Sequence, residues 1–167
     1  MQFKDKVIVV TGGAQGIGRC IVNEFERQGA VVCIIDKKQL DYSLKNNGIF
    51  FLGDIADKDV LDKFCKQIIE TFGHVDCIIN NALPIMKGIE ECSYEEFQYA
   101  MSVGVTAPFY LVKLFANNLG EGASIINISS SRDRMSQPQT ESYTAAKGGI
   151  AALTHALAVS LAGKARV

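Results

Sequence analysis

The fold of this 167-residue chain is decided by the stretch Thr11-Gly12-Gly13-Ala14-Gln15-Gly16-Ile17-Gly18. The stretch follows a short apolar run at 6–10, typical of a buried strand, and a helix-type pattern begins within it. Glycines between a strand and a helix let backbone N–H groups approach a diphosphate, and the helix dipole favours that anion. The stretch therefore predicts a nucleotide-binding turn, whose cofactor contacts we assign to Gly12, Gln15, Gly16, Ile17 and Gly18.

An acidic residue follows the turn at the spacing that such a site needs. Asp36 ends a second apolar run, residues 31–35. A carboxylate there accepts a hydrogen bond from the 2′-hydroxyl of an adenosine ribose and repels a 2′-phosphate. Lys37 and Arg19 weaken this argument, because either side chain could reach a phosphate. We expect NAD as the cofactor, with NADP as the less favoured alternative.

Three polar residues lie far downstream and suit acid–base chemistry. Tyr143 and Lys147 are separated by four positions, which places both on one face if the segment is helical. Ser130 follows another apolar run, residues 124–128. In isolation this set is also compatible with a core tyrosine and a solvated lysine.

Together with the glycine turn, these motifs make the chain similar to the short-chain dehydrogenase/reductase family, Tyr-x-x-x-Lys type. The matching pieces occur in the family's order over essentially the whole chain: the turn at 11–18, Asp54-Ile55, Asn80-Asn81-Ala82, Ser130 and the pair Tyr143 and Lys147. The resemblance implies an NAD-dependent oxidoreductase that moves a hydride between the nicotinamide and a secondary alcohol or ketone.

The resemblance also implies a role for each matching residue. Tyr143 would be the general acid/base, Lys147 would stabilise the phenolate and hold the nicotinamide ribose, and Ser130 would orient the substrate oxygen. For the rest of the cofactor, the implied contacts are Asp54 with the adenine amino group, Ile55 with the adenine ring, and Asn80 and Ala82 with the ribose. Asp54 could instead be a simple turn residue, and at least one of the asparagines could be structural.

Two departures from the family pattern occur. Gly104 stands where the family usually has an asparagine that holds a water for proton relay, so we do not transfer that role. Because glycine weakens a helix by about 1 kcal/mol relative to alanine, we expect a local distortion there. We also expect Gly104→Asn to be tolerated without loss of turnover. The second departure is Leu83-Pro84, which replaces the glycine that commonly follows Asn-Asn-Ala and stiffens the backbone.

Strand-type and helix-type segments alternate along the chain. We expect strands near 6–10, 31–35, 49–52, 75–79 and 123–128, and helices near 16–28, 58–72, 93–118 and 142–162. Asp57 would cap the second of these helices and Gly73 would end it, and Ser93 and Glu96 would open the third as a capping box. This alternation predicts one α/β domain over residues 1–167, a doubly wound parallel sheet (Rossmann fold) in three α/β/α layers. The ligand would lie where the first and fourth strands separate. Family members continue through further strands and a substrate lid, which we expect this chain to lack.

Composition excludes several other functions. The net charge is −1 and no basic tract occurs, so we expect no nucleic-acid partner. No apolar run is long enough to span a bilayer, and no signal peptide pattern begins the chain. Five cysteines form no C-x-x-C pair, which favours reduced thiols in a cytoplasmic protein. His74 and His155 are isolated, so we expect no metal site.

The remaining expectations concern partners and rival functions. We expect a small alcohol or carbonyl substrate, and the resemblance implies a homodimer or homotetramer paired through the two long helices. The alternatives are an NAD-binding protein without turnover and a truncated, inactive fragment. Specificity would lie in loops 83–92 and 131–141, where Arg132 and Arg134 weakly suggest an anionic substrate, although a solvated loop explains them as well.

Overall fold

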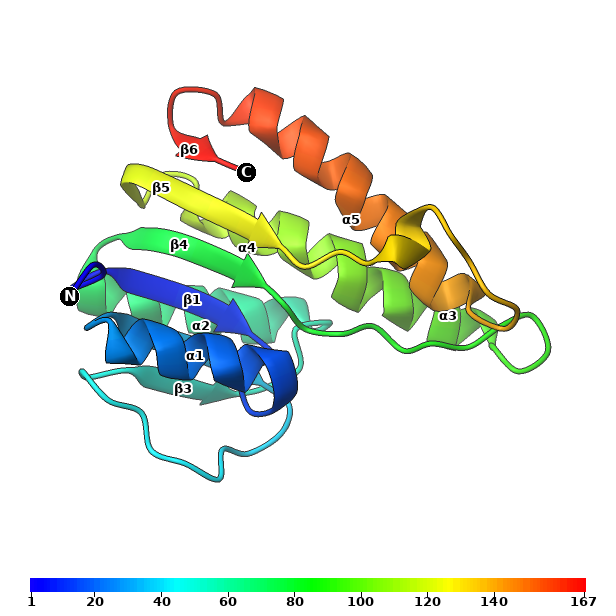
Figure 1. Cartoon of the computed structure of the whole chain (residues 1–167), viewed down its shortest axis with the longest axis horizontal. Helices are drawn as coiled ribbons and strands as arrows, with labels where there is room; N and C mark the ends of the chain where they lie inside the picture. The colour runs from blue at the N-terminus through cyan, green and yellow to red at the C-terminus, as the bar shows by residue number, and fades with distance from the viewer.

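A computed structural model describes all residues, 1–167, and contains a six-stranded parallel sheet with helices on both faces (Figure 1). The strands lie in the order β3-β2-β1-β4-β5-β6. Their bounds are β1 Val7–Thr11, β2 Val31–Asp36, β3 Ile49–Leu52, β4 Val75–Asn80, β5 Leu119–Asn127 and β6 Ala165–Arg166. The predicted doubly wound α/β sheet is therefore confirmed.

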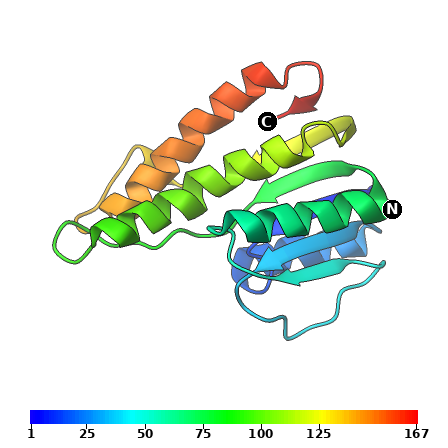
Figure 2. The same cartoon turned by 180° about the vertical axis from the view of Figure 1, so that it is seen from behind.

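The helices cover the sheet unequally, and two views show this arrangement (Figures 1 and 2). Their bounds are α1 Gly16–Arg27, α2 Lys58–Phe72, α3 Tyr94–Met101, α4 Ala107–Phe115 and α5 Glu141–Ser160. Side chains of α2, α4 and α5 share one core cluster with the sheet, whereas α1 packs into a separate cluster on the opposite face. None of these helices is both long and apolar enough to cross a membrane.

The apolar strand runs do not alternate because the central strands are covered on both faces. Val9, Val10, Ile34 and Ile78 are completely buried in β1, β2 and β4. Burial on both faces is the condition under which parallel strands read as continuous apolar runs. Each fully buried aliphatic side chain contributes about 1.5–3 kcal/mol of hydrophobic stabilisation.

The helix boundaries follow from local chemistry that the sequence predicted. Asp57 caps α2, since its carboxylate accepts from the backbone N–H of Asp59 at 2.8 Å. Gly73 ends the same helix with a φ of 76°, a left-handed conformation that glycine adopts without strain. Ser93 and Glu96 form the expected capping box at the start of α3.

The single long helix predicted over 93–118 is wrong in detail. The structure divides it into α3, a π-helical turn η1 at Ser102–Thr106 and α4, which ends at Phe115. The predicted local distortion at Gly104 is thereby confirmed, because this glycine lies inside the π-helical turn. The strand predicted to start at 123 begins at Leu119, because the chain already pairs there with Val75 of β4.

The turn η1 packs closely on α5, and two glycines make this possible. A Cβ atom added to Gly104 would lie 2.7 Å from the Cβ of Ala146 on α5. A Cβ added to Gly149 of α5 would lie 2.7 Å from a methyl group of Val105. No real Cβ atom tolerates such separations, so the two segments approach one another only because these positions lack side chains. The expectation that Gly104→Asn is tolerated is therefore wrong on steric grounds.

We predict that Gly104→Ala and Gly104→Asn each destabilise the fold by about 1–3 kcal/mol, because the added atoms overpack the contact with α5. Urea unfolding followed by circular dichroism measures this loss. Gly148→Ala is the matched control, since a Cβ there meets open space and the substitution favours the helix. Equal stability of the Gly104 variants and the control would contradict the steric argument.

Candidate active site

The glycine turn between β1 and α1 has the conformation that a phosphate cradle requires. Gly12 and Gly16 have φ values of 72° and 56°, which L-residues with side chains rarely adopt. A Cβ on Gly18 would lie only 2.0 Å from the carbonyl oxygen of Gly12, so no larger residue fits there. Neither a side-chain cap nor a first-turn acid occupies the start of α1, whose N–H groups can therefore bind an anion.

The end of β4 holds this turn in place. The backbone N–H groups of Asn81 and Ala82 both donate to the Thr11 hydroxyl at 3.0 Å. The side-chain amide of Asn81 donates to the carbonyl oxygens of Thr11 and Gly12 at 3.1 and 3.0 Å. These four bonds tie the loop after β4 to the loop after β1, at the point where the winding of the sheet reverses.

A cavity of about 380 Å³ opens at this point. Most of the residues predicted from the sequence line it: Gly12, Gln15, Gly16, Ile17, Gly18, Asp36, Asp54, Ile55, Ala82, Tyr143 and Lys147. The structure brings these residues together from segments that are far apart in the sequence. The cavity also contains Lys37 and Asn81, which the sequence analysis considered, and residues that it did not consider, among them Tyr99, Val103 and Ser129.

Asn80 and Ser130 do not line the cavity. The side chain of Asn80 is buried and donates to Asn127 of β5 at 2.7 Å, so it links two strands. Its neighbour Asn81 lines the cavity instead. Asn80 is therefore the structural asparagine that the sequence analysis considered as an alternative. The Ser130 hydroxyl accepts from the backbone N–H of Arg132 at 3.2 Å and caps a short 3-10 turn.

Ser129, and not Ser130, lines the cavity. Its hydroxyl donates to the carbonyl oxygen of Lys147 at 3.4 Å. The run of serines at 129–131 gives no sequence signal that ranks them, because the side-chain direction depends on how the backbone turns after β5. Only the three-dimensional structure distinguishes their environments.

The carboxylate of Asp36 is fixed at the rim of the cavity. Its two oxygens accept from the backbone N–H groups of Ala14 and Lys38, each at 2.9 Å. Ala14 belongs to the glycine turn, so this bond joins the acid at the end of β2 to the phosphate cradle. The carboxylate of Asp36 is thus held beside the glycine turn.

Asp54 makes the turn contact considered as its alternative role, and it has a second partner, Tyr99, that the sequence did not predict. One carboxylate oxygen accepts from the backbone N–H of Ala56 at 2.9 Å, and the other accepts from the Tyr99 hydroxyl at 2.6 Å. Both of its oxygens are therefore engaged, one in a turn and one with α3. Ile55 is 6% exposed and forms part of the apolar wall.

Tyr143 and Lys147 lie one helical turn apart on α5 and point to the same cavity. The Lys147 ammonium lies 5.6 Å from the centroid of the Tyr143 ring and donates to the carbonyl oxygen of Ile128. Burial of this side chain lowers the pKa of Lys147 from its ordinary value. The phenol and the ammonium therefore lie at one cavity and come from neighbouring turns of the same helix.

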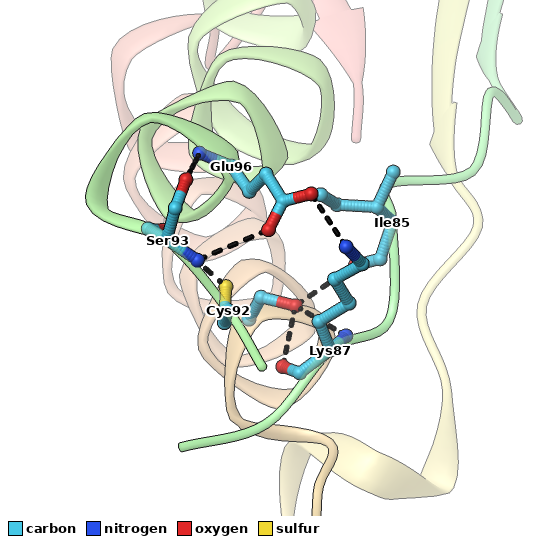
Figure 3. A network of polar contacts seen from close by, with 6 residues as sticks. Ile85, Lys87, Cys92, Ser93 and Glu96 are labelled. Atoms are coloured by element: carbon cyan, nitrogen blue, oxygen red, sulfur yellow. Dashed lines mark hydrogen bonds and ion pairs between the residues drawn. The ribbon is translucent and has the colours of Figure 1, made fainter. Parts of the chain in front are cut away.

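A polar network anchors the loop after β4 to α3 and to the start of α5. Lys87 pairs with Glu96 at 2.5 Å, and Glu96 also completes the capping box with Ser93 (Figure 3). The hydroxyl of Ser142, which is completely buried, donates to the carbonyl oxygen of Ile85 at 3.0 Å and accepts from the backbone N–H of Lys87 at 2.9 Å. Because Ser142 precedes Tyr143, this network fixes the first turn of α5.

The five cysteines form no disulfide. Burial raises the pKa of the Cys33 thiol to about 12, so this thiol is not a nucleophile at neutral pH. No group of three or more histidine, cysteine, aspartate or glutamate side chains gathers in an arrangement that could hold a metal ion.

Curated relatives of this chain are oxidoreductases. An uncharacterized oxidoreductase of Thermotoga maritima is 39% identical over 170 residues, which cover 95% of this chain and 66% of that protein. The L-fucose dehydrogenase of Mus musculus is 36% identical over 166 residues, covering 95% of this chain and 60% of that protein. The chain therefore spans 60% to 66% of the length of these two relatives.

Solved structures share the fold, and the similar proteins with a stated cofactor include one solved with NADH and one that is NADP-dependent. An apo SCOR enzyme from Clostridium thermocellum superimposes with a TM-score of 0.90 at 42% identity, covering 96% of this chain and 68% of that chain. A 3-ketoacyl-(acyl-carrier-protein) reductase from Brucella melitensis, complexed with NADH, gives 0.87 at 26% identity, covering 98% and 73%. The NADP-dependent (R)-specific alcohol dehydrogenase of Lentilactobacillus kefiri is 31% identical, covering 98% of this chain and 69% of that protein.

A family model described as short chain dehydrogenase matches residues 6–167, which is nearly the whole chain. The matched residues include the glycine turn, Asn81 and Ala82 after β4, and Tyr143 and Lys147 of α5, all of which line the cavity. The chain belongs to the short-chain dehydrogenase family.

Proposed function

We propose that this chain is an NAD-dependent oxidoreductase that transfers a hydride between the nicotinamide and a secondary alcohol or ketone. The observation that carries the proposal is that Tyr143 and Lys147 share one cavity with the glycine turn and Asp36. A proton-transferring phenol and a dinucleotide cradle in the same cavity are what hydride transfer to and from a carbonyl requires.

The residues around the cavity fit a dinucleotide. The N–H groups at the start of α1 would hold the diphosphate, Asp36 the adenosine ribose, and Lys147 the nicotinamide ribose. When bound, the nicotinamide supplies or accepts the hydride. The relatives include an NADP-dependent enzyme and one solved with NADH, so NAD is proposed from Asp36 and not from relatedness.

The protein's part in the reaction is proton transfer and orientation. In the oxidative direction, Tyr143 as phenolate takes the proton from the alcohol oxygen. The hydride leaves the carbon that bears this oxygen. In the reductive direction, the phenol returns that proton to the carbonyl oxygen. The Lys147 cation favours the phenolate, and the Ser130 hydroxyl would donate a hydrogen bond to the substrate oxygen, for which its proton is free.

The substrate is proposed only as a class. Loops 83–92 and 131–141 flank Tyr143, and their exposed apolar side chains include Leu83, Met86 and Met135. The relatives include an L-fucose dehydrogenase and an (R)-specific alcohol dehydrogenase, so sugars and simple secondary alcohols form the first panel to assay.

Three further properties belong to the same proposal. We infer that residues 1–167 act as one cofactor-binding and catalytic unit.

A homodimer or homotetramer is supported by exposed apolar side chains on α4 and α5, namely Phe109 and Val159. Five unpaired thiols support a reducing, cytoplasmic location.

We predict that Asp36→Ala weakens NADH binding about tenfold, because the ribose hydroxyls lose a charged acceptor. NADH fluorescence titration measures the change, with NADPH titrated in parallel. Glu70→Gln, which removes a carboxylate far from the cavity, is the control and should bind both cofactors as the unmodified protein does. Unchanged NADH affinity in Asp36→Ala would contradict the role of this acid.

We predict that Tyr143→Phe keeps NADH affinity within about twofold and lowers kcat by roughly 10²–10⁴, because only the proton-transferring oxygen is removed. Absorbance at 340 nm with the sugar and alcohol panel measures turnover. If the unmodified protein binds NADH tightly but turns over nothing in the panel, the alternative of an NAD-binding protein without turnover gains support.

We predict that Ser130→Ala lowers kcat about 10²-fold, since a donor to the developing oxyanion is lost, whereas Ser129→Ala lowers it less than tenfold. The two serines are adjacent, so each variant is the matched control of the other. Steady-state kinetics on the best panel substrate separates them. A larger loss in Ser129→Ala would transfer the orienting role to the serine that lines the cavity.

A further inference from the structure

A chain of hydrogen bonds crosses the adenosine side of the cavity. The Lys37 ammonium donates to the Tyr99 hydroxyl at 3.2 Å, and this hydroxyl donates to the Asp54 carboxylate at 2.6 Å. The ammonium also lies 5.4 Å from the centroid of the Tyr99 ring. All three residues line the cavity, and they come from the end of β2, from α3 and from the loop after β3.

Lys37 is the neighbour of Asp36, so its charge matters for cofactor choice. An ammonium free to swing toward the ribose would attract a 2′-phosphate and offset the repulsion by Asp36. The structure instead directs this ammonium to α3. The other two cations nearby are also engaged: Arg19 pairs with Asp41 at 2.9 Å, and Lys38 donates to Gln15 at 2.7 Å.

We propose that Tyr99 is a positioning residue for cofactor selection, which holds Lys37 away from the ribose and so favours NAD over NADP. The proposal rests on the proposed function, since it assumes that the cavity takes a nicotinamide dinucleotide. Under this proposal, the choice between NAD and NADP depends on a residue of α3 as well as on Asp36 and Lys37.

Two properties of Tyr99 make it suited to this role. It is half-buried, whereas Lys37 is exposed, so the tyrosine is the fixed member of the pair and the lysine the mobile one. Burial, followed by the hydrogen bond to Asp54, raises the pKa of Tyr99, and the bond to Tyr99 raises the pKa of Lys37. The phenol and the ammonium therefore both persist at neutral pH, and the chain of hydrogen bonds is intact there.

The test is the ratio of NADPH to NADH affinity, measured by fluorescence titration of the whole chain. Tyr99→Phe removes the hydroxyl and keeps the ring, whereas Tyr99→Leu removes both. We expect the ratio to shift toward NADPH in both variants, by about fivefold in Tyr99→Leu and by less in Tyr99→Phe. Because the gain comes from a freed charge, it should shrink as salt is raised.

The controls separate this role from a general disturbance. Adding Lys37→Ala to Tyr99→Leu should return the ratio toward that of the unmodified protein. Tyr94→Phe removes a hydroxyl from an exposed tyrosine of the same helix and should leave the ratio unchanged. Circular dichroism confirms that each variant is folded.

The outcomes are distinguishable. If the unmodified protein binds NADH and neither Tyr99 variant changes the ratio, the role of Tyr99 is overturned and the proposed function stands. A shift that persists after Lys37→Ala also overturns it, because the effect then does not pass through the lysine. If the unmodified protein binds neither cofactor, the proposed function itself fails, and the role of Tyr99 fails with it.

Discussion

The site depends on the pairing of β1 with β4. These strands are distant in sequence and adjacent in the sheet, and the chain winds away from them in opposite directions. The Thr11 hydroxyl strengthens the junction because it accepts from two consecutive backbone N–H groups, those of Asn81 and Ala82. This junction sets the distance between the glycine turn and the loop after β4, and the cavity lies between them.

A second constraint joins the acid–base residues to this cradle. Helix α5 carries Tyr143 and Lys147, and its position is fixed by close contact with η1 at Gly104 and Gly149. The start of α5 is fixed independently by the buried hydroxyl of Ser142. Both ends of this segment are held, so the phenol and the ammonium are fixed at the cavity; in the proposed reaction, such preorganisation would lower the barrier.

Much of the fold could be predicted from the sequence, because its signals are local. The capping box at Ser93, the cap at Asp57 and the left-handed Gly73 each act within a few residues, and each is confirmed. The π-helical turn was expected only as a distortion at Gly104, and the sequence could not show that Ala146 lies against it. That contact joins residues far apart in the chain, so the wrong expectation about Gly104→Asn was a failure to foresee packing.

The same limit explains what the sequence could not say about the site. Residue types and spacings identified eleven residues that line one cavity in the structure. They could not show whether Asn80 or Asn81, or Ser129 or Ser130, lines it. Both pairs lie at or just after the end of a strand, where the direction of each side chain depends on how the backbone leaves the sheet.

At the adenosine end of the cavity, the surrounding fold likewise determines the positions of two adjacent side chains, here of opposite charge. Asp36 and Lys37 are adjacent and carry opposite charges, so Lys37 weakens the preference for NAD that Asp36 indicates in the sequence. Two backbone N–H groups hold the carboxylate at the rim, while a tyrosine from a distant helix holds the ammonium away from it. Under the proposed function, cofactor preference would be a tertiary property, because it would depend on which of these two neighbouring charges the rest of the fold leaves beside the ribose.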